Sequence, residues 1–124
     1  MSSDTTVLIV EDDKWLAEQH ARVISGAGYK SVVATNAIDA MHIIDKNLPD
    51  IMVLDVLLTG STVFTLLHEM QSYADTGSIP VILCTNLASE LSLSDLSSYG
   101  VKQIIDKTIM LPEDLVTAIR RQLL

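Results

Sequence analysis

Polar residues that could carry phosphoryl chemistry follow closely after apolar runs at four places in this sequence. Two carboxylates follow the first run, a third follows the second, and a hydroxyl and an ammonium group follow the next two: Glu11, Asp12, Asp55, Thr85 and Lys107. A carboxylate can attack phosphorus to give an aspartyl-phosphate, and carboxylate oxygens are hard ligands that suit Mg²⁺. A lysine can hold a phosphoryl oxygen as a point charge. These residue types point to metal-assisted phosphoryl transfer, if folding brings them together.

Each of these residues also has an ordinary structural explanation when it is taken alone. Acidic residues before a helix stabilise its N-terminus, which accounts for Glu11 and Asp12. Asp55 could cap the end of its strand, Thr85 could stabilise the following turn, and Lys107 could be a surface lysine. The functional interpretation therefore depends on the set and on the fold that positions it.

The apolar runs alternate with amphipathic stretches of helical period, and this order predicts the fold. Uninterrupted apolar strands are typical of a parallel sheet covered by helices on both faces. Five strand–helix units predict an α/β fold, a doubly wound five-stranded parallel sheet, (βα)₅ and flavodoxin-like, in the strand order 2-1-3-4-5. Ligands of such folds bind at the carboxyl edge of the sheet, where all the polar residues above would meet.

Local signals set the expected ends of the helices. Gly26 and Gly28 are expected to end the first helix, Asn36 to cap the second, and Pro112 to occupy the first turn of the last. A fourth helix is expected at about 88–98, although five serines lower its propensity. Two inner faces are expected to be buried: Leu16, His20, Val23, Ile24 and Ala27 in the first helix, and Leu115, Ala118, Ile119 and Leu123 in the last.

Composition limits the class of protein. With 124 residues and 13.5 kDa, we expect one domain over residues 1–124. A net charge of −8 argues against nucleic-acid binding, since phosphate contacts need Lys and Arg. The apolar runs are too short to span a membrane, the polar N-terminus is unlike a signal peptide, and the single Cys84 suits a reducing cytoplasm.

Four segments of the chain carry a resemblance to a known family. They are VLIVEDD (7–13), IMVLDVLL (51–58), VILCTN (81–86) and IIDKT (104–108). With the spacing of Asp12, Asp55, Thr85 and Lys107, they resemble the receiver domain of two-component response regulators. The resemblance covers essentially the whole chain.

This resemblance implies a role for each candidate residue. Asp55 would be the phosphoacceptor, and Thr85 and Lys107 would contact the phosphoryl group. The Mg²⁺ ligands would be Glu11, Asp12, Asp55 and the backbone carbonyl of Leu57. The phosphoryl donor would be a sensor histidine kinase or a phosphotransfer protein, and a downstream protein would be the target. The chain would catalyse only its own phosphorylation and dephosphorylation.

The chain also departs from the family pattern near the candidate site. Thr59 and Val63 stand where receivers often have proline and glycine, so we expect a different path for this loop. Thr108 replaces the proline that usually follows the lysine, and we expect a trans peptide bond between Lys107 and Thr108. Ile104 replaces the usual aromatic switch residue. The output is therefore expected to run through the loop after the third strand or through the serine-rich fourth helix.

Two alternatives remain open on sequence grounds. A pseudo-receiver would keep the fold as an interaction module without a phosphorylation switch. The departures above support it, whereas the intact acid pair, Asp55, Thr85 and Lys107 oppose it. A hydrolase or NTPase would need other residues. No G-x-x-x-x-G-K-[ST] occurs in the chain, and Leu57 stands where an aspartate-nucleophile phosphatase would place its second acid.

Overall fold

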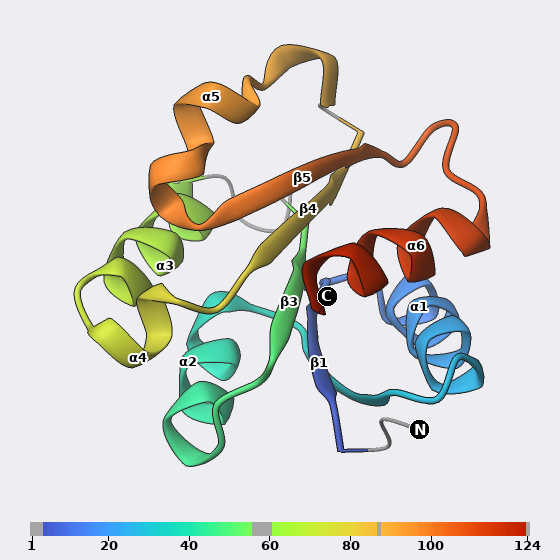
Figure 1. Ribbon diagram of the computed structural model, residues 1–124, viewed down its shortest axis with the longest axis horizontal. Helices are drawn as coiled ribbons and strands as arrows, with labels where there is room; N and C mark the ends of the chain where they lie inside the picture. Colours follow the sequence, from blue (N-terminus) through green and yellow to red (C-terminus); the bar gives the residue numbers. More distant parts are fainter. Residues whose placement is uncertain (1–3, 56–60, 87, 124) are drawn as a thin grey trace.

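The computed structural model describes residues 4–55, 61–86 and 88–123 as a parallel sheet with helices on both faces (Figure 1). The sheet has five strands in the order β2-β1-β3-β4-β5, and every pair of neighbours is parallel. The strands are β1 (Thr6–Val10), β2 (Lys30–Ala34), β3 (Ile51–Leu54), β4 (Val81–Thr85) and β5 (Val101–Asp106). The predicted doubly wound α/β fold and its strand order are confirmed.

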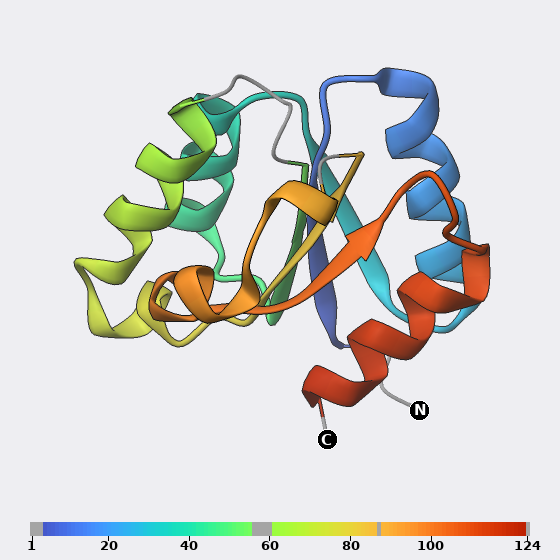
Figure 2. The same cartoon turned by 90° about the horizontal axis from the view of Figure 1, so that it is seen from above.

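Helices cover both faces of the sheet. α1 (Lys14–Gly26) and α6 (Pro112–Leu123) pack side by side on one face, whereas α2 (Ala37–Lys46) and α3 (Ser61–Gln71) lie on the other (Figure 2). A short α4 (Ala74–Gly77), absent from the sequence prediction, extends α3 toward β4. Because the central strands β1, β3 and β4 are buried on both faces, their side chains contribute to two separate cores.

The two cores divide the residues of each strand by alternation. In β1, Leu8 and Val10 pack toward α2 and α3, whereas Val7 and Ile9 pack toward α1 and α6. All four side chains are essentially inaccessible to solvent. Successive strand residues point to opposite faces, so a strand that serves two cores must be apolar throughout. This explains the uninterrupted apolar runs in the sequence.

Most of the predicted helix ends are confirmed. Asn36 caps α2, its side chain accepting a hydrogen bond from the Asp39 N–H at 2.8 Å. α6 begins at Pro112, whose missing N–H costs nothing in the first turn. α1 ends at Gly26, and Gly28 beyond it has a φ of +96°, a conformation that favours glycine.

The predicted helix at 88–98 is wrong as one continuous element. The segment forms three short pieces, η2 (Ala88–Glu90), α5 (Leu93–Leu96) and η3 (Ser97–Tyr99). Its serines bond locally: the Ser92 and Ser94 hydroxyls lie 2.8 Å apart, and the Ser97 hydroxyl donates to the Ser94 carbonyl at 3.2 Å. Such side-chain bonds compete with a regular helix.

The predicted inner face of α6 needs one correction. Leu115, Ala118 and Ile119 are buried as expected, but Leu123 is 37% exposed. The last turn of α6 extends past the described strands of the sheet (Figure 2). In α1, Ile24 and His20 are buried, while Leu16, Val23 and Ala27 are only partly covered.

The pairing of β4 with β5 contains an irregularity that changes the orientation of side chains in β5. Val81 pairs with Val101, but Ile82 pairs with Gln103, so one extra residue of β5 is passed over. A bulge of this kind exchanges the faces of all later residues. As a result, Ile104 packs on the same core as Val101, and Ile105 faces α6.

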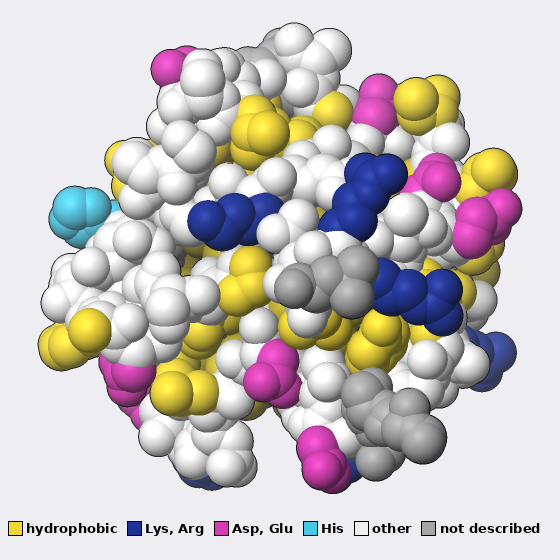
Figure 3. All heavy atoms as spheres, in the orientation of Figure 1, with side chains coloured by type: hydrophobic (Ala, Val, Ile, Leu, Met, Phe, Trp, Pro, Cys, Tyr) yellow, Lys and Arg dark blue, Asp and Glu magenta, His cyan; other side chains and the backbone are white. Residues whose placement is uncertain are grey.

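The surface over β5 and α6 carries basic side chains. Lys and Arg side chains gather over these two elements in the space-filling view (Figure 3). Lys102 of β5 and Arg120 and Arg121 of α6 are exposed. Among the described residues, no helix has the length and apolar character that crossing a membrane requires.

Candidate functional site at the carboxyl edge of the sheet

Four of the residues singled out in the sequence line one cavity at the carboxyl edge of the sheet. The cavity has a volume of about 400 Å³. Its described lining consists of Glu11, Asp12, Asp13, Leu16, His20, Asp55, Asn86, Lys107 and Met110. β1 and β3 are neighbours in the sheet, so Glu11 and Asp55 follow strands that end side by side. Lys107 reaches the same place from the end of β5.

Lys107 lies between two carboxylates. Its Nζ is 2.6 Å from Oε1 of Glu11 and 2.8 Å from Oδ2 of Asp55, and it donates a hydrogen bond to each. All three side chains are at least nine-tenths buried. Burial disfavours the charged ammonium, but the hydrogen bonds to Asp55 and Glu11 outweigh it, so the pKa of Lys107 lies above its ordinary value.

Glu11 is held in the cavity from two sides. Its Oε1 accepts from Lys107, and its Oε2 accepts from the backbone N–H of Asp13 at 3.3 Å. Burial nevertheless raises the pKa of Glu11 above its ordinary value, and the negative charge of Asp55 acts in the same direction. The carboxylates at this edge thus repel each other, and a further cation in the cavity would stabilise their charged forms.

The carboxylates are arranged to hold a metal ion. One oxygen each of Glu11, Asp12 and Asp55 lies within 4.8 Å of the other two. Mg²⁺ binds oxygen ligands, commonly one or two carboxylates with several waters, so this donor set fits it. Asp12 is exposed and accessible to an arriving ion, unlike the buried Glu11 and Asp55. The predicted fourth ligand, the carbonyl of Leu57, lies outside the described residues, as does the side chain of Val63.

Thr85 and Asn86, at the end of β4, differ in whether they line the cavity. Thr85 is fully buried at the end of β4, and its carbonyl accepts a hydrogen bond from the Lys107 N–H at 3.0 Å. It is not among the described residues that line the cavity, whereas the following Asn86, which sequence reasoning missed, is.

The Lys107–Thr108 bond is trans, as predicted. Asp13 caps α1, accepting from the Leu16 N–H at 3.1 Å.

One of the residues that line the cavity is a buried histidine. His20 is 5% exposed, and neither ring nitrogen has a hydrogen-bond partner in the described part of the chain. Burial lowers the pKa of His20, and the nearby Lys107 charge lowers it further, so the imidazole is neutral near pH 7. The helical period placed His20 on the inner face of α1 but could not show that this face reaches the acidic residues.

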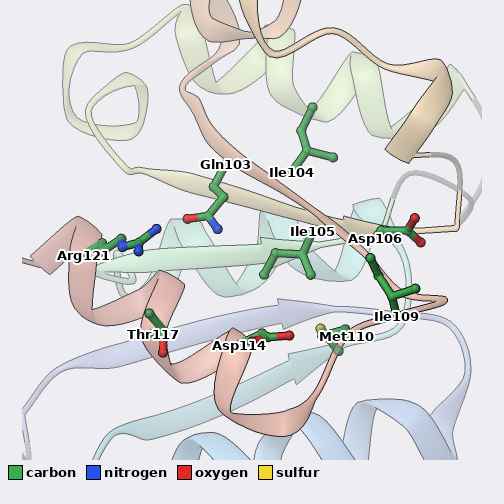
Figure 4. A pocket seen from close by; sticks show the side chains of 9 residues that line it. All are labelled: Gln103, Ile104, Ile105, Asp106, Ile109, Met110, Asp114, Thr117 and Arg121. Carbon is green, nitrogen blue, oxygen red and sulfur yellow. The ribbon is translucent and has the colours of Figure 1, made fainter.

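A second cavity of about 320 Å³ lies between β5 and α6 (Figure 4). Ile104 and Ile105 leave β5 on opposite sides there, and Asp114 of α6 lies near Met110 (Figure 4). Asp106, at the end of β5, accepts hydrogen bonds from the Thr108 hydroxyl at 2.6 Å and from its N–H at 2.9 Å. The bond from the hydroxyl, followed by the one from the backbone, lowers the pKa of Asp106.

Comparison with curated proteins gives distant relatives along almost the whole chain. The transcriptional regulatory protein YvrH of Bacillus subtilis is 27% identical over 121 residues, which are 97% of this chain and 49% of that protein. The phosphate regulon transcriptional regulatory protein PhoB of Pseudomonas aeruginosa is 29% identical over 115 residues, 93% of this chain and 50% of that protein. The chain thus spans about half the length of these relatives.

Solved structures of similar fold cover almost the whole chain. A putative response regulator from Chloroflexus aurantiacus has a TM-score of 0.82 and 31% identity, covering 97% of this chain and 98% of that one. A two-component response regulator from Clostridium difficile has a TM-score of 0.84 at 20% identity, covering 97% and 96%, and this likeness concerns the fold alone. Residues 7–120 match the family model of the response regulator receiver domain. This chain belongs to the family of response regulator receiver domains.

Proposed function

We propose that this chain is a phosphorylation-controlled receiver in which Asp55 accepts a phosphoryl group from a sensor histidine kinase or a phosphotransfer protein. The observation that carries the proposal is the position of Asp55. Its carboxylate is buried at the carboxyl end of β3, contacts Lys107 at 2.8 Å and lies within 4.8 Å of two further carboxylates. An acceptor, a cation and a metal-ligand set are thus present in one cavity.

The transfer would form one bond and break another. An oxygen of the Asp55 carboxylate attacks phosphorus, the new O–P bond gives an aspartyl-phosphate, and the bond between phosphorus and the donor nitrogen of a phosphohistidine breaks. The donor histidine leaves with the electron pair of that bond and takes up a proton. Lys107, which now bonds to Oδ2 of Asp55, then has a phosphoryl oxygen as its partner, and Thr85 donates its hydroxyl to another.

Glu11, Asp12, Asp55 and the carbonyl of Leu57 are the residues that would hold Mg²⁺. The bound ion would supply positive charge to the phosphoryl oxygens during transfer. Glu11 and Asp12 come from one strand end and Asp55 from the next, so the acceptor is oriented by the same contacts that select the ion.

The remaining assignments concern the setting of this reaction. We propose that residues 1–124 form one receiver domain that acts in the cytoplasm, passes its signal to a downstream protein by direct contact, and turns over no separate substrate. DNA binding and transcriptional control are named for some of the relatives. For this chain, with its net charge of −8, we propose no contact with nucleic acid or membrane.

The proposal is tested by incubating the protein with acetyl phosphate and Mg²⁺ and measuring its mass. A gain of one phosphoryl group is expected, and it should disappear in Asp55→Asn and persist in the matched control Asp45→Asn, whose side chain is exposed on α2. No gain in the wild type would favour the pseudo-receiver alternative. A gain that persists in Asp55→Asn would assign the acceptor to another residue.

A further inference from the structure

His20 is a polar residue of the cavity to which the proposed phosphoryl transfer assigns no role. Both of its ring nitrogens are buried and have no hydrogen-bond partner among the described residues. Burying a polar group without a partner costs free energy, so such groups in folded proteins normally bond to protein atoms, ordered water or an ion. The partner of His20 is therefore to be sought in the cavity that it lines.

The surroundings of His20 restrict what that partner can be. The cavity is also lined by the apolar Leu16 and Met110 and by the charged side chains of Glu11, Asp12, Asp13, Asp55 and Lys107. A cavity of about 400 Å³ is large enough for several water molecules. A neutral imidazole has one donor and one acceptor nitrogen, so it can bond to a water on either side.

Direct coordination of a cation by His20 is not what the geometry favours. The ligand atoms that lie within 4.8 Å of one another belong to Glu11, Asp12 and Asp55, and the group does not include His20. A water molecule between the imidazole and this group would connect the two. Outer contacts of this kind orient carboxylate ligands and tune the affinity of a metal site.

We propose that His20 is a positioning residue of the acidic cavity, whose buried imidazole holds an ordered water that hydrogen-bonds to the carboxylates of the metal site. The water is inferred from two observations, the unpaired nitrogens and the cavity that His20 lines. Its effect on the cation rests on the proposed function, because that function requires Mg²⁺ at Glu11, Asp12 and Asp55.

The test compares Mg²⁺ affinity, measured by calorimetry, among three variants of the full chain. His20→Leu should weaken Mg²⁺ binding about tenfold, as loss of an outer contact does at other metal sites. His20→Gln, whose amide keeps a donor and an acceptor, should restore most of the affinity. The control is Ile24→Val, one turn further along the same buried face of α1, which should lower stability and leave Mg²⁺ binding unchanged.

The outcomes separate this inference from the proposed function. If the wild type binds Mg²⁺ and His20→Leu binds it equally well, the positioning role is overturned and the proposed function stands. If the wild type binds no Mg²⁺, the proposed function fails, and a high-resolution crystal structure of the metal-free protein decides the inference. A water within hydrogen-bond distance of a His20 nitrogen supports it, and an imidazole without one contradicts it.

Discussion

The ammonium group of Lys107 lies 2.8 Å from the carboxylate of Asp55, the residue proposed to receive the phosphoryl group. The same nitrogen is 2.6 Å from Glu11, so one cation balances two buried acids that follow adjacent strands. Two like charges about 4 Å apart repel by roughly 4 kcal/mol at an effective dielectric constant near 20. Lys107 thus holds the site together when no metal is bound, and it must share Asp55 with an arriving ion.

Removal of this internal cation should destabilise the fold in a way that a metal can reverse. Lys107→Met removes the ammonium group that contacts both buried carboxylates, Glu11 and Asp55, and loss of one partner of a buried ion pair costs about 3–5 kcal/mol. We expect the free energy of unfolding in urea to fall by about this amount without Mg²⁺ and to recover in part when Mg²⁺ is added. Lys102→Met, at an exposed position of the same strand, is the control and should change little. Equal stability of both variants would contradict the role of the pair.

Stability should depend on pH through His20. Burial lowers the pKa of His20 in the folded protein, so below about pH 6.5 the unfolded chain binds a proton that the folded chain does not. The contribution of neutral His20 to the free energy of unfolding is therefore fully present above that pH and is lost as the pH falls. Urea unfolding at pH 7.5 and 5.5 should therefore show lower stability at pH 5.5, with a smaller difference in His20→Leu. His68→Gln, at an exposed site, should keep the full difference. The raised pKa of Glu11 acts with the opposite sign nearer pH 4.5.

Two glycines should respond differently to alanine. Gly100 has a φ of +84°, and a Cβ there would lie 3.0 Å from Nε2 of Gln71 and 3.4 Å from the Ile79 carbonyl. Gly100→Ala should cost about 1–2 kcal/mol of stability for the backbone conformation alone. Gly26 lies at the end of α1, and outside its own helix and chain neighbours no described atom lies within 4 Å of such a Cβ, so Gly26→Ala should be neutral or stabilising. Thermal unfolding of the two variants measures the contrast, and similar losses in both would contradict it.

Cys84 should be unreactive in the folded protein. It is buried in β4, its Sγ lies 3.5 Å from Sδ of Met110, and burial raises the pKa of its thiol to about 12. Reaction with a thiol reagent such as DTNB needs the thiolate and access to solvent. At pH 8 we expect labelling only when urea unfolds the chain, and rapid labelling of the native protein would show that β4 opens locally.

Phosphorylation should change the conformation of the segment between β4 and β5. Ile104 stands in place of the usual switch aromatic and packs against the core on the side of α3 and α5. The pieces η2, α5 and η3 are only three or four residues long, and such short elements have low local stability. The amide spectrum of residues 88–99 should change with acetyl phosphate and Mg²⁺ in the wild type and stay unchanged in Asp55→Asn. An unchanged wild-type spectrum would remove this segment from the output route.

Strong local patterns in the sequence were sufficient to predict the layers of the fold. Uninterrupted apolar strands required helices on both faces, and the side chain of Asn36 and the ring of Pro112 determined two helix starts by chemistry within one turn. The strand order then placed the candidate residues at one edge. These features depend on neighbouring residues or on rules that apply to every right-handed crossover.

Features that depend on distant contacts could not be predicted in this way. The breaks within 88–99 depend on which serines find a local partner, and the exposure of Leu123 depends on where the sheet ends beneath α6. The contacts of Lys107 with Glu11 and Asp55 join residues from the ends of three strands. The residue type of Lys107 therefore predicted a contact with a phosphoryl group, but it could not predict the ion pairs that the lysine makes with the two acids. The unpaired nitrogens of His20 are likewise a property of the packed cavity.

The bulge near the amino end of β5 affects the orientation of the residues at its carboxyl end, where the candidate site lies. Because Ile82 pairs with Gln103, Lys102 is passed over and remains exposed, and every later residue of β5 is rotated to the other side. Lys107 lies five residues beyond Lys102, roughly 16 Å along an extended chain. If Lys102 instead paired with Ile82, every later residue of β5 would turn to the opposite face, and the lysine at the end of the strand would point away from Asp55. The bulge at the amino end of β5 therefore determines whether Lys107, at the other end, faces Asp55.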